Sequence, residues 1–260
     1  MAKLYALDGS SKGEVKLPSV FSTLVRKDLI NRAALALMSQ RRQAYGTDPV
    51  AGLRTSAHYK GVKDKRGSMK NREIARATRI TGGNPGMEWK ARKAPHTTKG
   101  RRAHPPKAEK IWAQKINRKE MKLAIASAIA ATSDKLAIGR EIPIDLPVIV
   151  DDAIEGVTKT SDMSKFLMLM KLGGEMERAK LKKIRAGRGK MRGRKYKKKR
   201  SILFVAVKAD GLRRAVENLP GMDVTTVKDM DILMLAPNMT GGRLAIFTKG
   251  ALDELAKMYK

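Results

Sequence analysis

The sequence predicts an α/β fold: a three-layer globule with a mostly parallel sheet, interrupted by a long extended basic arm. Short apolar strand patterns alternate with helical patterns towards the C-terminus, which is typical of a parallel sheet covered by helices. Residues 46–108, by contrast, show no sustained apolar periodicity. The hydrophobic fraction of 42% is still enough to build a core, so at least part of the chain should pack.

The two N-terminal segments around the turn at Gly9 are predicted to be short strands, Lys3–Leu7 and Glu14–Leu17. A helix is predicted from Asp28 to Ala44, because apolar residues recur there at helical spacing. The remaining helices and strands follow the basic arm. They are predicted as helix Arg118–Thr132, capped by Asn117 and Glu120; strand Pro147–Val150; a helix capped by Ser161 and ended by Gly173 and Gly174; helix Glu175–Ala186; strand Ile202–Val207; helix Asp210–Asn218; strands Val224–Val227, Ile232–Leu235 and Leu244–Phe247; and helix Lys249–Tyr259.

The charge is strongly positive. The 260 residues include 56 Lys and Arg against 25 Asp and Glu, a net charge of +31. Such a surface attracts polyanions, and nucleic acid is the natural partner because each neutralised phosphate releases a condensed counterion. If roughly ten phosphates are contacted, log K should fall with log salt concentration with a slope of about −7 to −9.

Several other classes of site and partner are not expected. Cysteine is absent, so neither a disulfide framework nor a thiolate metal site is possible, which fits a reducing cytoplasm. The first twenty residues do not suggest a signal peptide, and the longest clean apolar run, Ile202–Val207, is too short to span a bilayer. The basic stretches also lack the bulky apolar face of a membrane-lying helix. No membrane partner, metal, cofactor or small-molecule substrate is therefore expected.

The arm, residues 46–108, is rich in Gly, Pro, Lys and Arg and poor in apolar side chains. A structureless loop of this length is uncommon within a compact domain, and little apolar burial could offset its ordering entropy. We expect it to be disordered when free, or ordered by a polyanion. The predicted organisation is one α/β domain, residues 1–45 and 109–260, with the arm inserted in it.

A second basic segment, residues 185–200, holds ten Lys or Arg in sixteen residues and no acid. Its glycines do not have the spacing of a nucleotide-binding loop, and the segment precedes a strand rather than following one. Close approach of the backbone to RNA phosphates explains Gly with Arg better. The residues predicted to bind RNA are Arg54, Lys60, Lys63, Arg66, Arg72, Arg76, Arg79, Trp89, Lys90, Arg92, Lys93, His96, Lys99, Arg101, Arg102, His104 and Lys107 in the arm, and Arg185, Arg188, Lys190, Arg192, Arg194, Lys195, Tyr196 and Lys197 in the second segment.

A few residues allow a catalytic or metal-binding reading as well as a structural one. Asp151 and Asp152 end a predicted strand, where α/β enzymes often place catalytic groups, but no second acid cluster or His accompanies them. We expect them to cap or solvate the loop. All three histidines, His58 among them, fall in the arm, where RNA contact is favoured over metal binding.

Aromatic and methionine residues also allow a functional and a structural interpretation. Trp89 lies among cations and suits an unstacked base better than local packing, whereas Ile111 and Trp112 are predicted to be core. Flexible core filling is predicted for the methionines of one helix, Met163, Met168 and Met170.

Five stretches, in order along nearly the whole chain, resemble the archaeal and eukaryotic branch of the universal large-subunit ribosomal protein four family. They are 17–21 (LPSVF), 41–49 (RRQAYGTDP), 100–110 (GRRAHPPKAEK), 183–197 (KIRAGRGKMRGRKYK) and 218–224 (NLPGMDV). The resemblance implies a three-layer α/β globule and an arm that threads into large-subunit rRNA. It places the arm tip, between about Val62 and Lys93, at the wall of the nascent-polypeptide exit tunnel. It also implies neighbouring ribosomal proteins and the nascent polypeptide as partners, and a cytoplasmic location in the large ribosomal subunit.

The favoured hypothesis is therefore an archaeal-type structural constituent of the large ribosomal subunit that binds rRNA, supports subunit assembly and is not an enzyme. Two alternatives remain. One is an RNA-processing enzyme with its site at Asp151 and Asp152. The other is a basic nucleic-acid-binding protein outside the ribosome, such as a DNA-compacting protein.

Overall fold

The computed structural model describes residues 1–259, and the chain divides into two units. The first, here called the globular unit, comprises Met1–Arg41 and Ala113–Lys260, and the second, here called the insert, comprises Arg42–Trp112. The segment expected to be an extended arm, residues 46–108, lies within the insert. No helix in the described chain is long and apolar enough to cross a bilayer.

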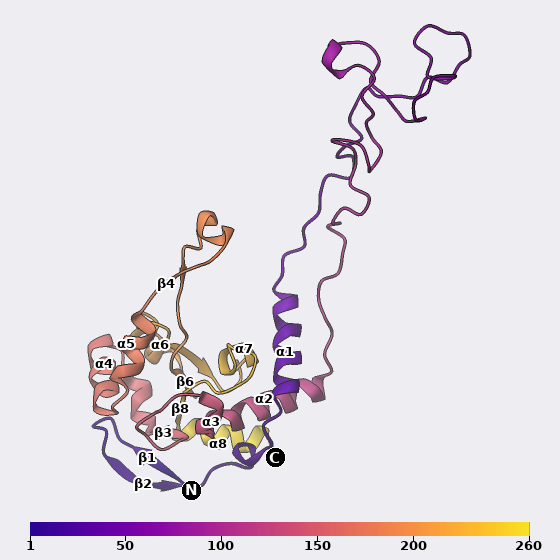
Figure 1. The fold of residues 1–260 in the computed structure, drawn as a ribbon. Coiled ribbons are helices and arrows are strands. Elements are labelled where there is room, and N and C mark those ends of the chain that lie inside the picture. The colour runs from indigo at the N-terminus through magenta and orange to yellow at the C-terminus, as the bar shows by residue number, and fades with distance from the viewer. Residues whose placement is uncertain (260) are drawn as a thin grey trace. The chain divides into compact units, whose positions relative to one another are not determined.

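The globular unit is built on a six-stranded sheet (Figure 1). Only the pair β1 and β2 is antiparallel, so the prediction of a mostly parallel sheet is confirmed. In spatial order the strands are β2 (Ser11–Val15), β1 (Ala2–Tyr5), β3 (Val148–Val150), β8 (Ala245–Thr248), β6 (Leu203–Ala206) and β7 (Asp223–Thr226).

Side chains along the central strands point alternately to the two faces of the sheet, which produces two cores, one on each face. Ile149, Leu203 and Phe247 belong to one buried cluster, whereas their neighbours Phe204 and Ile246 belong to the other. Successive side chains of a strand point to opposite faces, so strands covered on both sides are apolar at every position. The result is the predicted arrangement of three layers.

Helices on one face of the sheet supply the first core: α1 (Lys27–Gln40), α2 (Arg118–Ser133), α7 (Ile232–Leu235) and α8 (Lys249–Met258). The second core takes its helical residues from α3 (Lys135–Ile138), the 3-10 helix η3 (Asp152–Gly156), α4 (Thr160–Leu169) and α6 (Asp210–Val216), and α5 (Gly173–Lys180) packs Met176 against it. A 3-10 helix, η1 (Ser19–Ser22), adds Val20 and Phe21 to the first core.

Helix starts were predicted well where a capping pair marks them. The Asn117 backbone N–H donates to Glu120 Oε2 at 3.4 Å, as the capping pair predicts. The end of α1 was predicted four residues too late. The helix stops at Gln40, and the Arg41 N–H closes its last turn on Leu37 O. Residues 41–43 carry no apolar side chain and Ala44 is exposed, so the buried stripe of the helix does not continue beyond Gln40.

The prediction was wrong around α4 and α5. The N-cap of α4 is Lys159, not Ser161, and the helix ends before Lys171, which has a left-handed φ of 54°. Gly173 opens α5 rather than ending α4, and α5 stops at Lys180 rather than at Ala186. The cause is pairing downstream, which draws the next residues into a hairpin instead of a further helical turn.

That hairpin, here called the basic hairpin, pairs β4 (Lys183–Ile184) with β5 (Tyr196–Lys197) in antiparallel register. A 3-10 helix, η4 (Arg188–Arg192), forms its tip. It is a separate two-stranded sheet, distinct from the six-stranded one (Figure 1).

A second error concerns Ile232–Leu235, predicted to be a strand and found as α7. Ile232 and Leu235 are fully buried, while Leu233 and Met234 between them are only partly buried. Burial three residues apart is helical spacing, but four consecutive apolar residues do not reveal which spacing will be used.

The insert contains little core. Its buried residues are Ala57, Ser68, Met69 and Arg92, and its one regular element is a 3-10 helix, η2 (Pro85–Met87). The outgoing and returning legs lie side by side, since Thr47 N–H donates to Pro106 O at 3.0 Å and a Cβ on Gly52 would meet the Arg101 backbone at 2.6 Å. Gly52 also has a φ of +78°, so only glycine suits this crossing without strain.

Two predictions of burial were wrong. Ile111 is 86% exposed rather than core, and Trp112 is only partly buried, in the insert. Met163 and Met170 fill the second core as predicted, but Met168 is 64% exposed because it lies on the outer side of α4.

Candidate nucleic-acid interface

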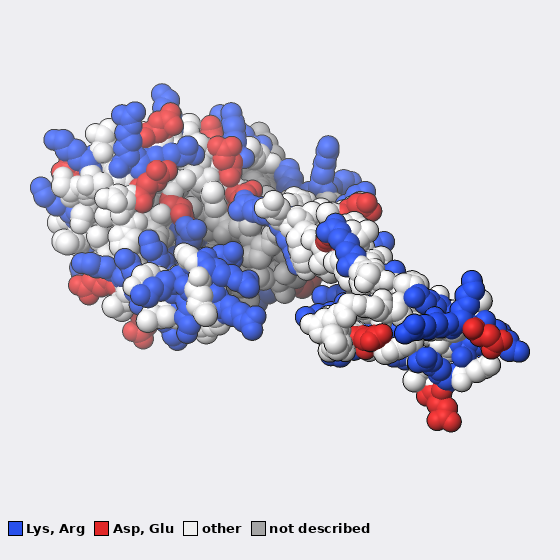
Figure 2. Space-filling view, turned by 90° about the horizontal axis from the view of Figure 1, so that it is seen from above, with Lys and Arg blue, Asp and Glu red and all other residues white. Residues whose placement is uncertain are grey.

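Most of the residues predicted to bind RNA lie at the surface, where Lys and Arg outnumber Asp and Glu on the visible face (Figure 2). The exceptions are Arg79, Trp89, Lys93 and Arg185, which are partly buried, and Arg92, which is buried. Two separate groups result. One is the surface of the insert and the other is the basic hairpin of the globular unit.

Two predicted arginines of the insert direct their guanidinium groups inwards. Arg92, 9% exposed, donates from Nη1 to Thr98 O at 3.0 Å and to the carbonyl of Ala91 at 3.1 Å. Arg79 donates to Trp89 O at 2.8 Å and to Ala75 O at 3.1 Å. These side chains link turns of the insert, so their first effect is on its conformation.

Trp89 packs against a cation within the insert. The Arg72 guanidinium lies 4.3 Å from the centre of its ring, and Trp89 itself has a left-handed φ of 62°. A guanidinium over an indole face is a favourable cation–π arrangement. One ring face is therefore used locally, and stacking of a base on Trp89 stays a prediction.

An aromatic stack that was not predicted from the sequence lies where the two legs of the insert begin and end. The Tyr45 and Trp112 rings are stacked, 5.6 Å apart and inclined by 11°. The Arg42 guanidinium lies 3.8 Å from the centre of the Trp112 ring, and Lys110 Nζ lies 4.5 Å away. Tyr45 and Trp112 are too far apart in the sequence for a periodic pattern to predict their contact. The one visible signal is that each aromatic residue has a cation close to it in the sequence, Arg42 and Lys110.

Backbone strain is concentrated in the insert. Within residues 1–259, five of the seven non-glycine residues with positive φ are found there: Asp64, Asn71, Trp89, Lys93 and Lys99. Each such residue costs of order 1–3 kcal/mol unless its surroundings enforce it. Because the insert has so few buried side chains, its own packing contacts contribute little to holding these residues at positive φ.

The histidines show no metal-binding geometry. His58, His96 and His104 are all exposed, and the His58 ring nitrogen Nδ1 lies 3.0 Å from Ser56 O. Within residues 1–259 there is no group of three or more His, Asp or Glu side chains arranged to hold a metal ion.

The basic hairpin presents its cations to solvent. Its strands hold each other through the Arg185 N–H, which donates to Lys195 O at 2.8 Å, and through Arg185 Nε, which donates to Arg194 O at 3.1 Å. The Tyr196 ring is half exposed, with Lys182 and Lys195 ammonium groups 5.9 and 5.6 Å from its centre. Arg185 thus acts mainly on hairpin geometry.

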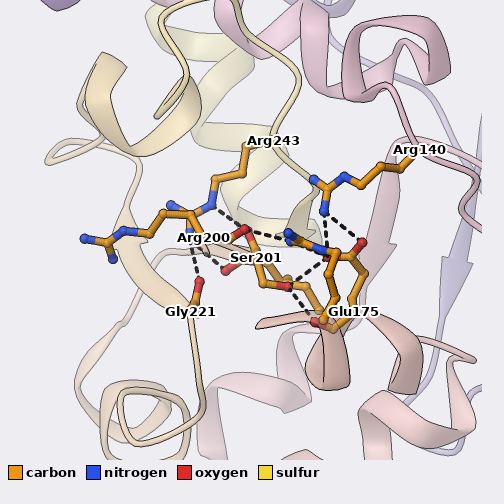
Figure 3. A network of polar contacts seen from close by, with 8 residues as sticks. Arg140, Glu175, Arg200, Ser201, Gly221 and Arg243 are labelled. Carbon is orange, nitrogen blue, oxygen red and sulfur yellow. Dashed lines mark hydrogen bonds and ion pairs between the residues drawn. The ribbon is translucent and has the colours of Figure 1, made fainter. Parts of the chain in front are cut away.

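A buried arginine that the sequence did not single out anchors the hairpin to the sheet (Figure 3). The Arg243 side chain is 2% exposed and donates to Ser201 O at 2.6 Å, Ile202 O at 3.1 Å and Gly221 O at 3.2 Å. Its charge is balanced by Asp223 Oδ2, 2.6 Å away. Burial lowers the pKa of Arg243 from its ordinary value, and Asp223 opposes that shift.

A second ion network lies beside it, centred on Glu175 (Figure 3). Arg140 and Arg178 each approach the Glu175 carboxylate to 2.8 Å, and Ser201 Oγ donates to it at 3.1 Å. Burial alone would raise the pKa of Glu175, but the hydrogen bond from Arg178 and the charge of Arg140 bring it below its ordinary value. Arg178 also donates to Arg200 O at 2.8 Å, so the network holds the returning end of the hairpin.

Asp151 and Asp152 have structural contacts. Asp152 Oδ1 accepts the Gly250 N–H, in the first turn of α8, at 2.7 Å. Asp151 accepts the Asp152 N–H at 2.9 Å and pairs with Lys12, whose hydrogen bond lowers the pKa of Asp151. Both carboxylates are thus engaged as caps or ion pairs, as the structural reading expects.

The geometry defines the class of protein: an α/β protein whose distinguishing surface is cationic and lies on elements that contribute little to its cores. Comparison with known proteins identifies the family. A model of the ribosomal protein L4/L1 family matches residues 15–258. The chain belongs to this family, and the resemblance noted in the sequence is confirmed.

Archaeal relatives are similar over nearly the full length. The chain is 42% identical to the large ribosomal subunit protein uL4 of Methanococcoides burtonii, covering 99% of this chain and 98% of the relative. It is 41% identical to uL4 of Archaeoglobus fulgidus, covering 98% of each, and 41% identical to uL4 of Haloarcula marismortui, covering 98% and 99%. Family membership makes the chain a structural ribosomal protein rather than an enzyme.

Proposed function

We propose that this structural ribosomal protein binds large-subunit rRNA through two surfaces, the basic hairpin and the insert, and thereby supports assembly of the large subunit. The cytoplasm is its place of action, as a part of that subunit. Neighbouring large-subunit proteins are its further partners, contacted by the globular unit.

The observation that carries this proposal is the mismatch between charge and core. Both surfaces hold many exposed cations, yet the insert buries only Ala57, Ser68, Met69 and Arg92. In the described chain, the buried side-chain polar atoms without a partner all lie in the insert: Arg79 Nε, Thr81 Oγ1 and Trp112 Nε1. Such groups are rare in a self-sufficient fold, which supports a partner that completes the insert.

The expected mechanism is neutralisation and recognition of shape rather than reading of base sequence. Guanidinium groups bind phosphate oxygens through paired hydrogen bonds, and exposed arginines such as Arg188, Arg192 and Arg194 are free to do so. Contacts to phosphates and sugars fix position and orientation on folded RNA. Glycines in the hairpin allow the backbone to approach closely.

For the insert we propose the role of an arm, residues 46–108, whose tip lies between about Val62 and Lys93. In this proposal the tip reaches the wall of the nascent-polypeptide exit tunnel and contacts the nascent polypeptide. The support is the family resemblance together with the exposed cations of the insert and its shortage of core.

Sedimentation tests the proposal directly. A lysate of the source cells is run through a sucrose gradient at moderate salt, and the protein is quantified in each fraction. We expect one copy per large subunit in the large-subunit peak. Absence from that peak would overturn the proposal. Sedimentation with genomic DNA instead would favour a DNA-compacting protein.

A further inference from the structure

A hollow of about 500 Å³ lies in the globular unit between the base of the basic hairpin and the turn 237–242 that leads into β8. Eight of the thirteen residues that line it are Lys or Arg, and none is Asp or Glu. The cations that the argument uses are Arg140, Arg178, Lys183, Lys197, Lys198 and Lys199. They come from four places in the chain: the loop after α3, the end of α5 and the two ends of the hairpin.

The positive charge of this hollow is only partly balanced. Glu175, which does not line the hollow, pairs with Arg140 and Arg178, and Asp223 pairs with Arg200 and Arg243. These arginines are held in place by contacts within the globular unit. The lysines differ, because none of the four forms an ion pair among residues 1–259 and all are exposed.

We propose that this hollow binds a phosphate group of an RNA backbone, making a contact separate from those of the hairpin tip. The inference rests on the proposed function, in which rRNA supplies the phosphate. The volume of the hollow falls within the range of pockets that enclose small ligands, so the hollow can hold a phosphodiester together with part of a sugar. The hollow is lined both by guanidinium groups held in ion pairs and by exposed lysines without one, which suits one multiply contacted anion.

The inference adds residues that the sequence did not indicate. Arg140, Arg178 and Lys183 lie outside the basic segment 185–200, and Lys198 and Lys199 fall within it but were not among the predicted contacts. The sheet and the Glu175 network bring them together.

The first test measures anion binding by the full chain without RNA. Inorganic phosphate is titrated at constant ionic strength while the backbone amide NMR signals of Asn238 and Gly241, which line the hollow, are followed. We expect a saturable shift in the wild type. The double variant Lys183→Gln/Lys198→Gln should bind at least tenfold more weakly, or not at all.

The matched control is Lys16→Gln/Lys228→Gln, which removes two exposed lysines away from the hollow. It should titrate like the wild type, and circular dichroism checks that all three proteins are folded. A shift that does not saturate, or equal weakening in both double variants, would overturn the inference, because binding would then follow net charge alone.

The second test uses transcribed large-subunit rRNA. The slope of log K against log salt should be smaller by about one for the hollow variant, because one phosphate contact is lost, and unchanged for the control. If the two variants behave alike while the wild type binds rRNA tightly, the hollow makes no RNA contact and the inference fails. If the wild type prefers no rRNA over random RNA, the proposed function fails instead, and the phosphate titration still decides whether the hollow binds anions.

Discussion

At the scale of single residues, Arg243 shows how one buried charge can order several elements. Its guanidinium donates to carbonyl groups at Ser201, Ile202, Gly221 and Met234, and it pairs with Asp223. Ser201 and Ile202 directly precede β6, Gly221 precedes β7, and Met234 lies within α7. Without the guanidinium, each carbonyl would be buried with fewer donors, and the Asp223 carboxylate would lose a close cation.

Replacing Arg243 by Met should therefore lower the free energy of unfolding by about 3–5 kcal/mol, the usual cost of breaking a buried ion pair by removing one partner. Urea unfolding followed by circular dichroism measures it. Arg214→Met serves as the control, because Arg214 is exposed and forms no ion pair among residues 1–259. The control should change stability by less than about 0.5 kcal/mol. Equal effects would show that Arg243 contributes only as a surface charge would.

The contribution of Glu175 to the free energy of unfolding depends on pH. The pKa of Glu175 is lowered in the folded protein, so the folded state binds this proton less readily than the unfolded state. Its contribution is fully present above the unfolded pKa, about 4.3, and is lost as pH falls through the lower folded pKa. The stability gap between wild type and Glu175→Gln should therefore shrink as pH is lowered through that window.

Urea unfolding of both proteins at a series of pH values between neutrality and strong acid measures this gap. Glu177→Gln, two residues further along α5, controls for general acid effects, since Glu177 is exposed and forms no ion pair among the described residues. A gap that stays constant with pH would mean that the carboxylate contributes only through its shape and neutral hydrogen bonding.

At the scale of elements, sequence patterns predicted most of the sheet and the long helices. Strands β3, β6 and β8 are uninterrupted apolar runs because both their faces are covered, and α2 carries a capping pair. These signals are local, so they could be read directly. The errors lie where contacts with other parts of the chain determine the secondary structure. Residues Ile232–Leu235 form the helix α7 instead of a strand, and α5 is shortened by strand pairing in the basic hairpin.

The candidate site divides in the same way. Exposed cations such as Arg188 and Arg192 could be predicted from local composition alone. The inward donors Arg92 and Arg243 could not be predicted, because the sequence does not show whether a guanidinium faces solvent or a carbonyl group. The hollow was hidden for a further reason, since Arg140, Arg178 and Lys183 meet only once the chain has folded.

The turn between α7 and β8 depends on a glycine. Gly242 has a φ of +82°, and a Cβ there would overlap the Ala137 carbonyl oxygen in α3. Gly242→Ala should therefore destabilise the protein by more than the ~1–2 kcal/mol that a left-handed conformation alone costs an L-residue. Gly193→Ala is the matched control, because Gly193 has a similar φ of +76° but open space around it.

Thermal unfolding of the two glycine variants gives their melting temperatures, which can be compared directly. The control should lose only the conformational penalty, and Gly242→Ala should lose more because backbone atoms must also shift. Similar melting temperatures would show that the overlap with Ala137 is relieved by small movements. The contribution of close packing between α3 and this turn would then be minor.

At the scale of the whole molecule, the two units differ in what holds them together. The globular unit has two apolar cores, whereas the insert holds five strained residues and few buried side chains. Burial of apolar surface is the main term that opposes conformational entropy. We therefore expect the insert, residues 42–112, to open at little cost when the protein is alone. Under the proposed function, contacts with RNA would supply the missing order.

Limited trypsin digestion tests this difference. In the isolated protein we expect the earliest cuts between Gly46 and Ala108, because a protease needs locally unfolded chain and opening costs least there. Mass spectrometry locates the cuts. Lys122 in α2 and Lys257 in α8 are internal controls, since they offer the same cleavage chemistry on helices that pack against the first core.

Added large-subunit rRNA should protect the insert at low salt and cease to do so as salt is raised, because the protecting contacts are ionic. Cleavage at the control lysines should follow global unfolding and depend little on RNA. An insert as resistant as α2 and α8 in the absence of RNA would show that its turns and cation–π contacts order it without a core. The insert would then be a second folded unit in its own right, and charge alone would be what RNA binding requires of it.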